Sequence, residues 1–115
     1  MNNNNNLPGQ ICKPCQGGLA AMSKTQAKTL VAQLHGDWSL DNEGTQLTRS
    51  FKFKGFAKAV YQANLVAWLA DQESHHPDVK FGWGYCDVIF TTHDIGGLSE
   101  NDFICATKLD NLTHK

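Results

Sequence analysis

The sequence lacks the features that would indicate a nucleic-acid-binding, membrane or secreted protein. Lys and Arg number 10 against 11 Asp and Glu, giving a formal net charge of −1, and they form no basic tract of the kind that binds nucleic-acid backbones or anionic lipid. No apolar run approaches the ~18 residues of a membrane span. The first ten residues, MNNNNNLPGQ, contain neither the basic nor the apolar region of a secretory signal. We therefore expect a cytoplasmic protein with no nucleic-acid or membrane partner.

Cysteine is also scarce, and the four thiols do not form an obvious site. Cys12 and Cys15 have the Cys-x-x-Cys spacing of a redox pair or half a zinc site, but they lie in a segment rich in Gly, Pro and Gln. A structural zinc site would need a second matched pair. Cys86 and Cys105 are instead 19 residues apart, inside apolar segments, so we expect buried or unreactive thiols there.

The length of 115 residues is that of one domain. Residues 1–21 are low in complexity and predict a flexible leader, and residues 22–115 predict a single folded domain. The apolar patterns within it predict seven elements: a helix from Ser23 to a stop at Gly36, strands within 37–40 and 45–56, a long helix at 55–74 closed by Pro77, strands at 78–81 and 85–93, and a last helix at 98–112.

Capping signals support the first and last helices. Ser23 is followed three residues later by Gln26, as in a capping box, and Ser99 is followed by Asp102 at the same spacing. The order α-β-β-α-β-β-α places two hairpins beside helices. It predicts an α+β fold, in which a four-stranded antiparallel sheet carries the helices on one face.

Two adjacent histidines, His75 and His76, stand at the predicted end of the long helix. Asp71 lies one helical turn before His75, where its carboxylate can fix the tautomer of the imidazole. His76 precedes Pro77 and should leave the helix in another direction. His93 ends a strand, so three imidazoles can meet at one site. An imidazole titrates near pH ~6.5 and can give or take a proton at neutral pH.

Two other interpretations of these histidines remain open. Histidines at a helix end are often solvated surface residues. Three imidazoles can also bind zinc, although the chain has no His-x-His or His-x-x-x-His spacing that would direct two rings at one ion.

Several motifs resemble the pterin-4a-carbinolamine dehydratase family. They are ESHHPDV at 73–79, Trp83 and TTHDIGGLSENDF at 91–103. In that family a His-His-Pro is followed, seventeen residues after its second histidine, by Thr-His, and a Gly-Leu-Ser/Thr-x-x-Asp opens the last helix. His76 and His93 have this spacing here, and the glycine, leucine, serine and aspartate also match. The resemblance covers residues 22–112.

The resemblance implies a dehydratase that removes water from 4a-hydroxytetrahydropterin to give quinonoid dihydropterin, without metal or cofactor. This reaction serves the recycling of tetrahydrobiopterin for aromatic amino-acid hydroxylases. The implied catalytic residues are His75, His76 and His93. The implied substrate-binding residues are Asp71, Pro77, Thr91, Thr92, Asp94, Ile95 and Trp38, the last stacking on the pterin ring.

Two details of the implied site concern carboxylates. Many family members have an acidic residue directly before the histidine pair, where this chain has Ser74, so support for His75 is expected from Asp71. Asp102 is expected to cap its helix and not to bind substrate.

We also expect a homo-oligomer, either a dimer or a tetramer. On the strand at 85–93, Tyr85 and Ile89 lie on the face opposite the predicted core, and leaving them in water costs ~25 cal/mol per Å² of apolar area. The resemblance implies the same, because members of that family form dimers or dimers of dimers. The alternative function is that of a non-enzymatic dimerisation or transcriptional cofactor that binds a protein partner.

Overall fold

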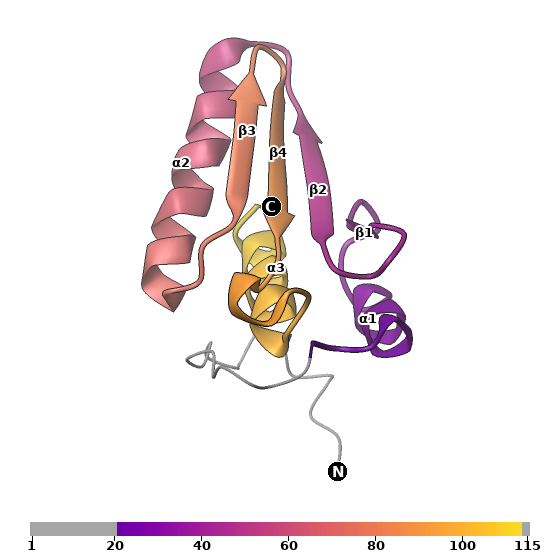
Figure 1. Cartoon of the computed structure of the whole chain (residues 1–115). Helices are drawn as coiled ribbons and strands as arrows, with labels where there is room; N and C mark the ends of the chain where they lie inside the picture. Colours follow the sequence, from indigo (N-terminus) through magenta and orange to yellow (C-terminus); the bar gives the residue numbers. More distant parts are fainter. Residues whose placement is uncertain (1–20, 114–115) are drawn as a thin grey trace.

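The computed structural model describes residues 21–113 (Figure 1). The predicted leader at 1–21 lies almost wholly outside the described residues, as do Cys12, Cys15 and His114. The helices are α1 (Lys24–Val31), α2 (Phe56–Glu73), the short 3₁₀ helix η2 (His93–Ile95) and α3 (Glu100–Thr113); the strands are β1 (Ser39–Leu40), β2 (Leu47–Lys52), β3 (Asp78–Gly82) and β4 (Tyr85–Phe90). Over these residues, no helix is both long and apolar enough to traverse a bilayer.

The four strands form one antiparallel sheet in the order β1-β2-β4-β3. β1 pairs with β2 and β3 with β4, so both predicted hairpins are present. The two hairpins meet through β2 and β4, in a register that places Leu47 opposite Phe90 and Phe51 opposite Cys86. The predicted α+β fold, with its order α-β-β-α-β-β-α, is confirmed.

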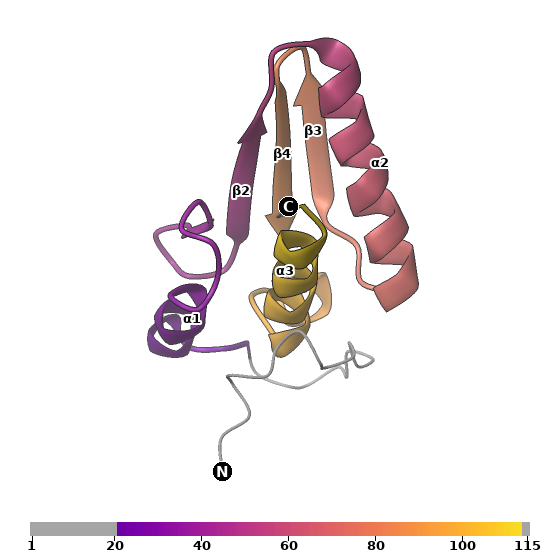
Figure 2. The ribbon, with the colours of Figure 1, turned by 180° about the vertical axis from the view of Figure 1, so that it is seen from behind.

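The sheet has one buried face, and α2 and α3 lie on the same side of it (Figures 1 and 2). Side chains alternate between the faces of a strand. On β4 the expected inward residues Cys86, Val88 and Phe90 are buried, whereas Tyr85 and Ile89 on the opposite face are half-buried. The core therefore lies between the sheet and its two longer helices.

The first helix starts where the sequence predicts but ends sooner. Ser23 and Gln26 form the expected capping box, with both reciprocal hydrogen bonds present. The helix ends at Val31, five residues before Gly36. One reason is that the His35 backbone N–H donates to the Asp110 carboxylate of α3 at 3.1 Å, instead of to a carbonyl of its own helix.

The long helix α2 also ends before Pro77, at a left-handed residue. Ser74 has φ 53° and closes the helix, and the His75 N–H then donates to the Ala70 carbonyl at 3.2 Å. This closure is the left-handed termination that usually employs glycine. It turns the chain one residue before the histidine pair, so His75 does not continue the face of the helix on which Asp71 lies.

Cys86 and Cys105 are free thiols, and both are buried. Burial, together with the nearby charge of Asp87, raises the pKa of the Cys86 thiol to about 11. The expectation of buried cysteines is confirmed for these two residues.

The turn between β1 and β2 is organised by the carboxylate of Asp41. It accepts the Thr45 N–H at 2.6 Å, the Thr45 hydroxyl at 2.6 Å and the Gln46 N–H at 3.0 Å. Partial burial tends to raise the pKa of Asp41, but these hydrogen bonds outweigh burial and lower it below 3.8. The lowered pKa means that ionised Asp41 stabilises the folded chain.

Replacing Asp41 by Asn should lower the free energy of unfolding at pH 7 by about 1–2 kcal/mol, because hydrogen bonds to a charged acceptor are lost. The stabilisation by ionised Asp41 is present above its unfolded pKa of 3.8 and disappears as the pH falls through the lower folded pKa. Denaturant unfolding of both proteins at several pH values measures this difference. An equal difference at pH 7 and pH 2 would contradict the assignment.

Candidate functional site

A cavity of about 290 Å³ opens between the end of α2 and the segment that follows β4. Its lining comes from two separate stretches of sequence, residues 74–76 and 91–94. Six of the ten predicted site residues lie in this lining. The lining residues are Ser74, His75, His76, Thr91, Thr92, His93 and Asp94.

His75 is the buried member of the three histidines, with 8% of its surface exposed. Its ring lies parallel to that of Phe90, with 6.1 Å between centroids and 6° between planes. Its Nε2 is 2.6 Å from Oδ1 of Asp102. The expected support from Asp71 is therefore wrong for His75, because the left-handed turn at Ser74 directs the ring toward α3 instead of along α2.

Asp102 is the functional candidate whose role the sequence analysis underestimated. It is fully buried, and its Oδ2 accepts the Ser99 N–H at 3.0 Å, as expected of a helix cap. The same oxygen also accepts a hydrogen bond from the Thr92 hydroxyl at 2.7 Å, while Oδ1 is hydrogen-bonded to Nε2 of His75. The carboxylate thus joins α3, the segment after β4 and the end of α2. The spacing of Ser99 and Asp102 signalled the cap but not these tertiary contacts.

A carboxylate can only accept, so the hydrogen bond to Asp102 places a proton on His75 Nε2. In the neutral ring, Nδ1 is then the acceptor nitrogen. Among the described residues, Nδ1 of His75 has no hydrogen-bond partner. Nδ1 of His75 is therefore the ring nitrogen whose lone pair is left for a further hydrogen bond.

His76 is held much more loosely than His75. Its Nε2 is 3.0 Å from Oδ1 of Asp71, so the aspartate that was assigned to His75 pairs with its neighbour. The side chains of His76 and Asp71 are 62% and 81% exposed. An exposed pair of this kind contributes ~0–1 kcal/mol, so His76 keeps rotational freedom and contact with water.

The remaining wall of the cavity follows β4. His93 begins η2 and is exposed. Thr92 forms an isolated bridge with Gly97, which closes the loop containing His93 and Asp94. The Thr91 hydroxyl donates to the Thr45 carbonyl at 2.7 Å, so the hairpin turn organised by Asp41 also anchors this wall.

Four of the predicted site residues do not line the cavity. Trp38 is buried in the core, where its ring packs against Phe90 and its Nε1–H donates to Asp110 at 2.8 Å. It is therefore not placed to stack on a ring in this cavity, because the indole N–H finds its partner on α3. Pro77, Ile95 and Asp71 lie outside the lining as well, although Asp71 reaches the cavity through His76.

The described part of the chain contains no group of three or more His, Cys, Asp or Glu side chains that could hold a metal ion. His75, His76 and His93 line this cavity together. One is fixed and buried and two are exposed, an arrangement that can carry acid and base catalysis on a small molecule.

The sequence matches known proteins over most of its length. A family model described as pterin 4 alpha carbinolamine dehydratase matches residues 20–112. A relative from Nitrosomonas eutropha is 46% identical over 112 residues, covering 97% of each chain, and one from Legionella pneumophila strain Lens is 42% identical, covering 92% of this chain and 94% of its own. Both carry provisional names as pterin-4-alpha-carbinolamine dehydratases.

Solved structures agree with the fold. A transcriptional coactivator/pterin dehydratase from Brucella melitensis superposes with a TM-score of 0.72 at 27% identity, covering 80% of this chain and 97% of its own. A pterin dehydratase-like protein identified as a RuBisCO assembly factor in the alpha-carboxysome has a TM-score of 0.58 at 21% identity, over 70% of this chain and 94% of its own, and supports the fold alone. With its cavity of three histidines and a family match over residues 20–112, the chain belongs to the pterin 4 alpha carbinolamine dehydratase family.

Proposed function

We propose that this protein removes water from 4a-hydroxytetrahydropterin to give quinonoid dihydropterin, in the recycling of tetrahydrobiopterin for aromatic amino-acid hydroxylation. The observation that carries the proposal is the meeting of His75, His76 and His93 at one cavity, with His75 fixed by a buried carboxylate. Family membership supports the same substrate class.

The reaction requires two proton transfers, and the cavity offers groups for both. The bond between C4a and its hydroxyl oxygen breaks, and an acid must protonate that oxygen so that it leaves as water. The adjacent ring nitrogen loses its proton to a base, and the remaining electron pair forms the new carbon–nitrogen double bond. The proton lost and the proton supplied balance, so the enzyme returns to its starting state after exchange between its histidines and solvent.

The geometry favours His75 as the base. Its Nε2 proton is engaged by Asp102, so Nδ1 is the nitrogen that can receive a proton from the substrate. The negative charge of Asp102 stabilises the imidazolium that forms. His76 and His93 are exposed, so either can be reprotonated from solvent and act as the acid. Thr91 and Asp94 supply polar groups to the rest of the wall.

We further propose that the protein acts as a homo-oligomer. Tyr85 and Ile89 on the outer sheet face are only half-buried, and Tyr61 and Trp68 on α2 are 66% and 55% exposed. Large exposed aromatic side chains are typical of protein interfaces. A role in binding another protein is the second candidate function, and it uses the same surfaces.

Replacing His76 or His93 by Ala should lower turnover of chemically generated 4a-hydroxypterin by about 10²–10⁴, because each change deletes a proton-transfer group. The fold should be kept, since both side chains are exposed. Stopped-flow absorbance of quinonoid dihydropterin formation measures turnover, and circular dichroism checks the fold. Undiminished turnover in both folded variants would refute the catalytic assignment.

Replacing Asp102 by Asn should lower kcat more than replacing Asp71 by Asn, because the amide cannot accept from both His75 and Thr92 as the carboxylate does. A loss of about 1–3 kcal/mol in unfolding free energy is also expected. Ser99→Ala is the control, since it removes the hydrogen bond between the hydroxyl groups of Ser99 and Thr92 and keeps the carboxylate beside His75. Equal kcat losses in the Ser99 and Asp102 variants would show that Asp102 acts through stability alone.

Multi-angle light scattering of the purified protein at micromolar concentration should give two or four times the chain mass of 12.7 kDa. Ile89→Lys should shift the mass toward one chain, because a charge on the outer sheet face opposes its burial against a second copy. A wild-type mass near 12.7 kDa would contradict the proposed oligomer.

A further inference from the structure

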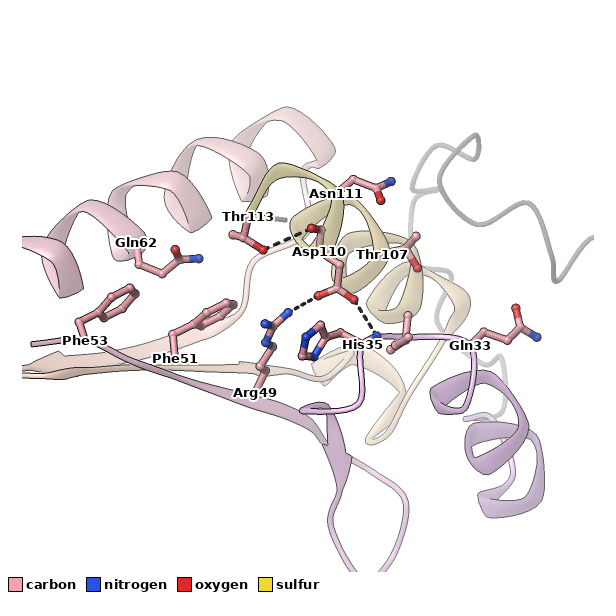
Figure 3. A pocket seen from close by; sticks show the side chains of 11 residues that line it. Gln33, His35, Arg49, Phe51, Phe53, Gln62, Thr107, Asp110, Asn111 and Thr113 are labelled. Atoms are coloured by element: carbon pink, nitrogen blue, oxygen red, sulfur yellow. Dashed lines mark hydrogen bonds and ion pairs between the residues drawn. The ribbon is translucent and has the colours of Figure 1, made fainter. Parts of the chain in front are cut away.

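A second cavity, of about 480 Å³, lies on the helix side of the sheet (Figure 3). Phe51 and Phe53 form its wall on the β2 side, Gln62 reaches it from α2, Asp110 from α3, and His35 from the connection after α1. Its volume is within the ~300–1,000 Å³ of small-molecule pockets. It shares no lining residue with the histidine cavity.

Arg49 and Asp110 are charged residues that line this second cavity, and they form an ion pair. Arg49 is 9% exposed, its guanidinium lies 4.2 Å above the ring of Phe51, and one of its N–H groups donates to Oδ1 of Asp110. Its Nε is buried and has no hydrogen-bond partner. The amide nitrogen of Gln62, on the opposite side of the same cavity, is also buried and unpaired. Buried polar groups are nearly always paired, so two unpaired donors beside one cavity call for a common acceptor.

Asp110 accepts from another nitrogen of Arg49, but it bonds to neither Arg49 Nε nor the Gln62 amide nitrogen. Its Oδ1 accepts from Arg49 and from Trp38 Nε1, and its Oδ2 accepts the His35 backbone N–H. The two buried unpaired groups of the residues that line the cavity are donors, so they are complementary to an acceptor on a ligand. A pterin is a poorer match, since its lactam edge and amino group carry N–H donors of their own.

We propose that this cavity is a second binding site, for a small aromatic carboxylate. The carboxylate accepts from Arg49 and Gln62, and the ring lies against Phe51 and Phe53. A carboxylate matches the geometry of a guanidinium, which can donate to both of its oxygens. Both unpaired nitrogens are buried, so binding requires a rotation of these two side chains that presents them to the ligand, as is common at binding sites. The site is additional to the proposed dehydration and uses none of its residues.

The test is a titration of the ¹⁵N-labelled full chain with benzoate and 3-phenylpropionate, followed by two-dimensional NMR. We expect saturable shifts in the backbone amides of Arg49, Phe51 and Asp110, with Kd on the order of 0.1–1 mM, while the amides of 91–94 do not move. Benzamide and acetate are the matched probes, since one lacks the charge and the other the ring. Each should bind about tenfold or more weakly than benzoate.

Gln62→Leu and Arg49→Lys separate the site from non-specific binding. Leu is close to Gln in size and removes only the amide, so this variant should fold and bind 3-phenylpropionate about three- to tenfold more weakly. Arg49→Lys should weaken binding further, because Lys cannot donate in the same fork. His93→Ala should bind as the wild type does. Absence of saturable shifts, shifts centred on 91–94, or unchanged affinity in Gln62→Leu would overturn the proposal.

Discussion

The buried carboxylate of Asp102 is the interaction on which the candidate site depends. A fully buried carboxylate is costly unless its oxygens are hydrogen-bonded, and here three donors from separate parts of the chain satisfy it: His75 after α2, Thr92 after β4 and Ser99 before α3. Removing one of these donors leaves the buried carboxylate less well satisfied and so destabilises the arrangement of the other two. The positions of the fixed imidazole and of the Thr92 side chain beside it therefore depend on one carboxylate.

The helix α3 organises both cavities through two of its carboxylates, Asp102 and Asp110. Asp102 in its first turn orders the histidine cavity, whereas Asp110 near its other end takes the side chains of Trp38 and Arg49 and so orders the second cavity. The histidine cavity combines one imidazole held by buried contacts with two that remain in water. Such a division suits a reaction that needs one oriented base and one acid in exchange with solvent.

The parts of the fold that depend on local patterns could be predicted from the sequence. The capping box at Ser23, the inward face of β4 and the two hairpins follow from spacing and alternation, and the motif residues at 74–76 and 91–94 do meet. Contacts between distant segments could not be predicted. Helical spacing placed Asp71 near His75. The left-handed residue that ends the helix is Ser74 and not the usual glycine, so the sequence contains no signal of it, and the His75 ring instead contacts a carboxylate 27 residues away. Trp38 was likewise expected to stack on the ligand. Its hydrogen-bond partner, Asp110, is 72 residues away in sequence, so local patterns could not indicate that contact.

The pterin should bind beside a His75 ring that Asp102 holds in place. A crystal structure of the protein with a reduced pterin that has no 4a-hydroxyl group to lose tests it most directly. The pterin ring is expected in the cavity of His75, His76 and His93, with Nδ1 of His75 facing it and Nε2 still bonded to Asp102. A pterin ring in the cavity of Arg49, or a His75 ring rotated away from Asp102, would contradict it.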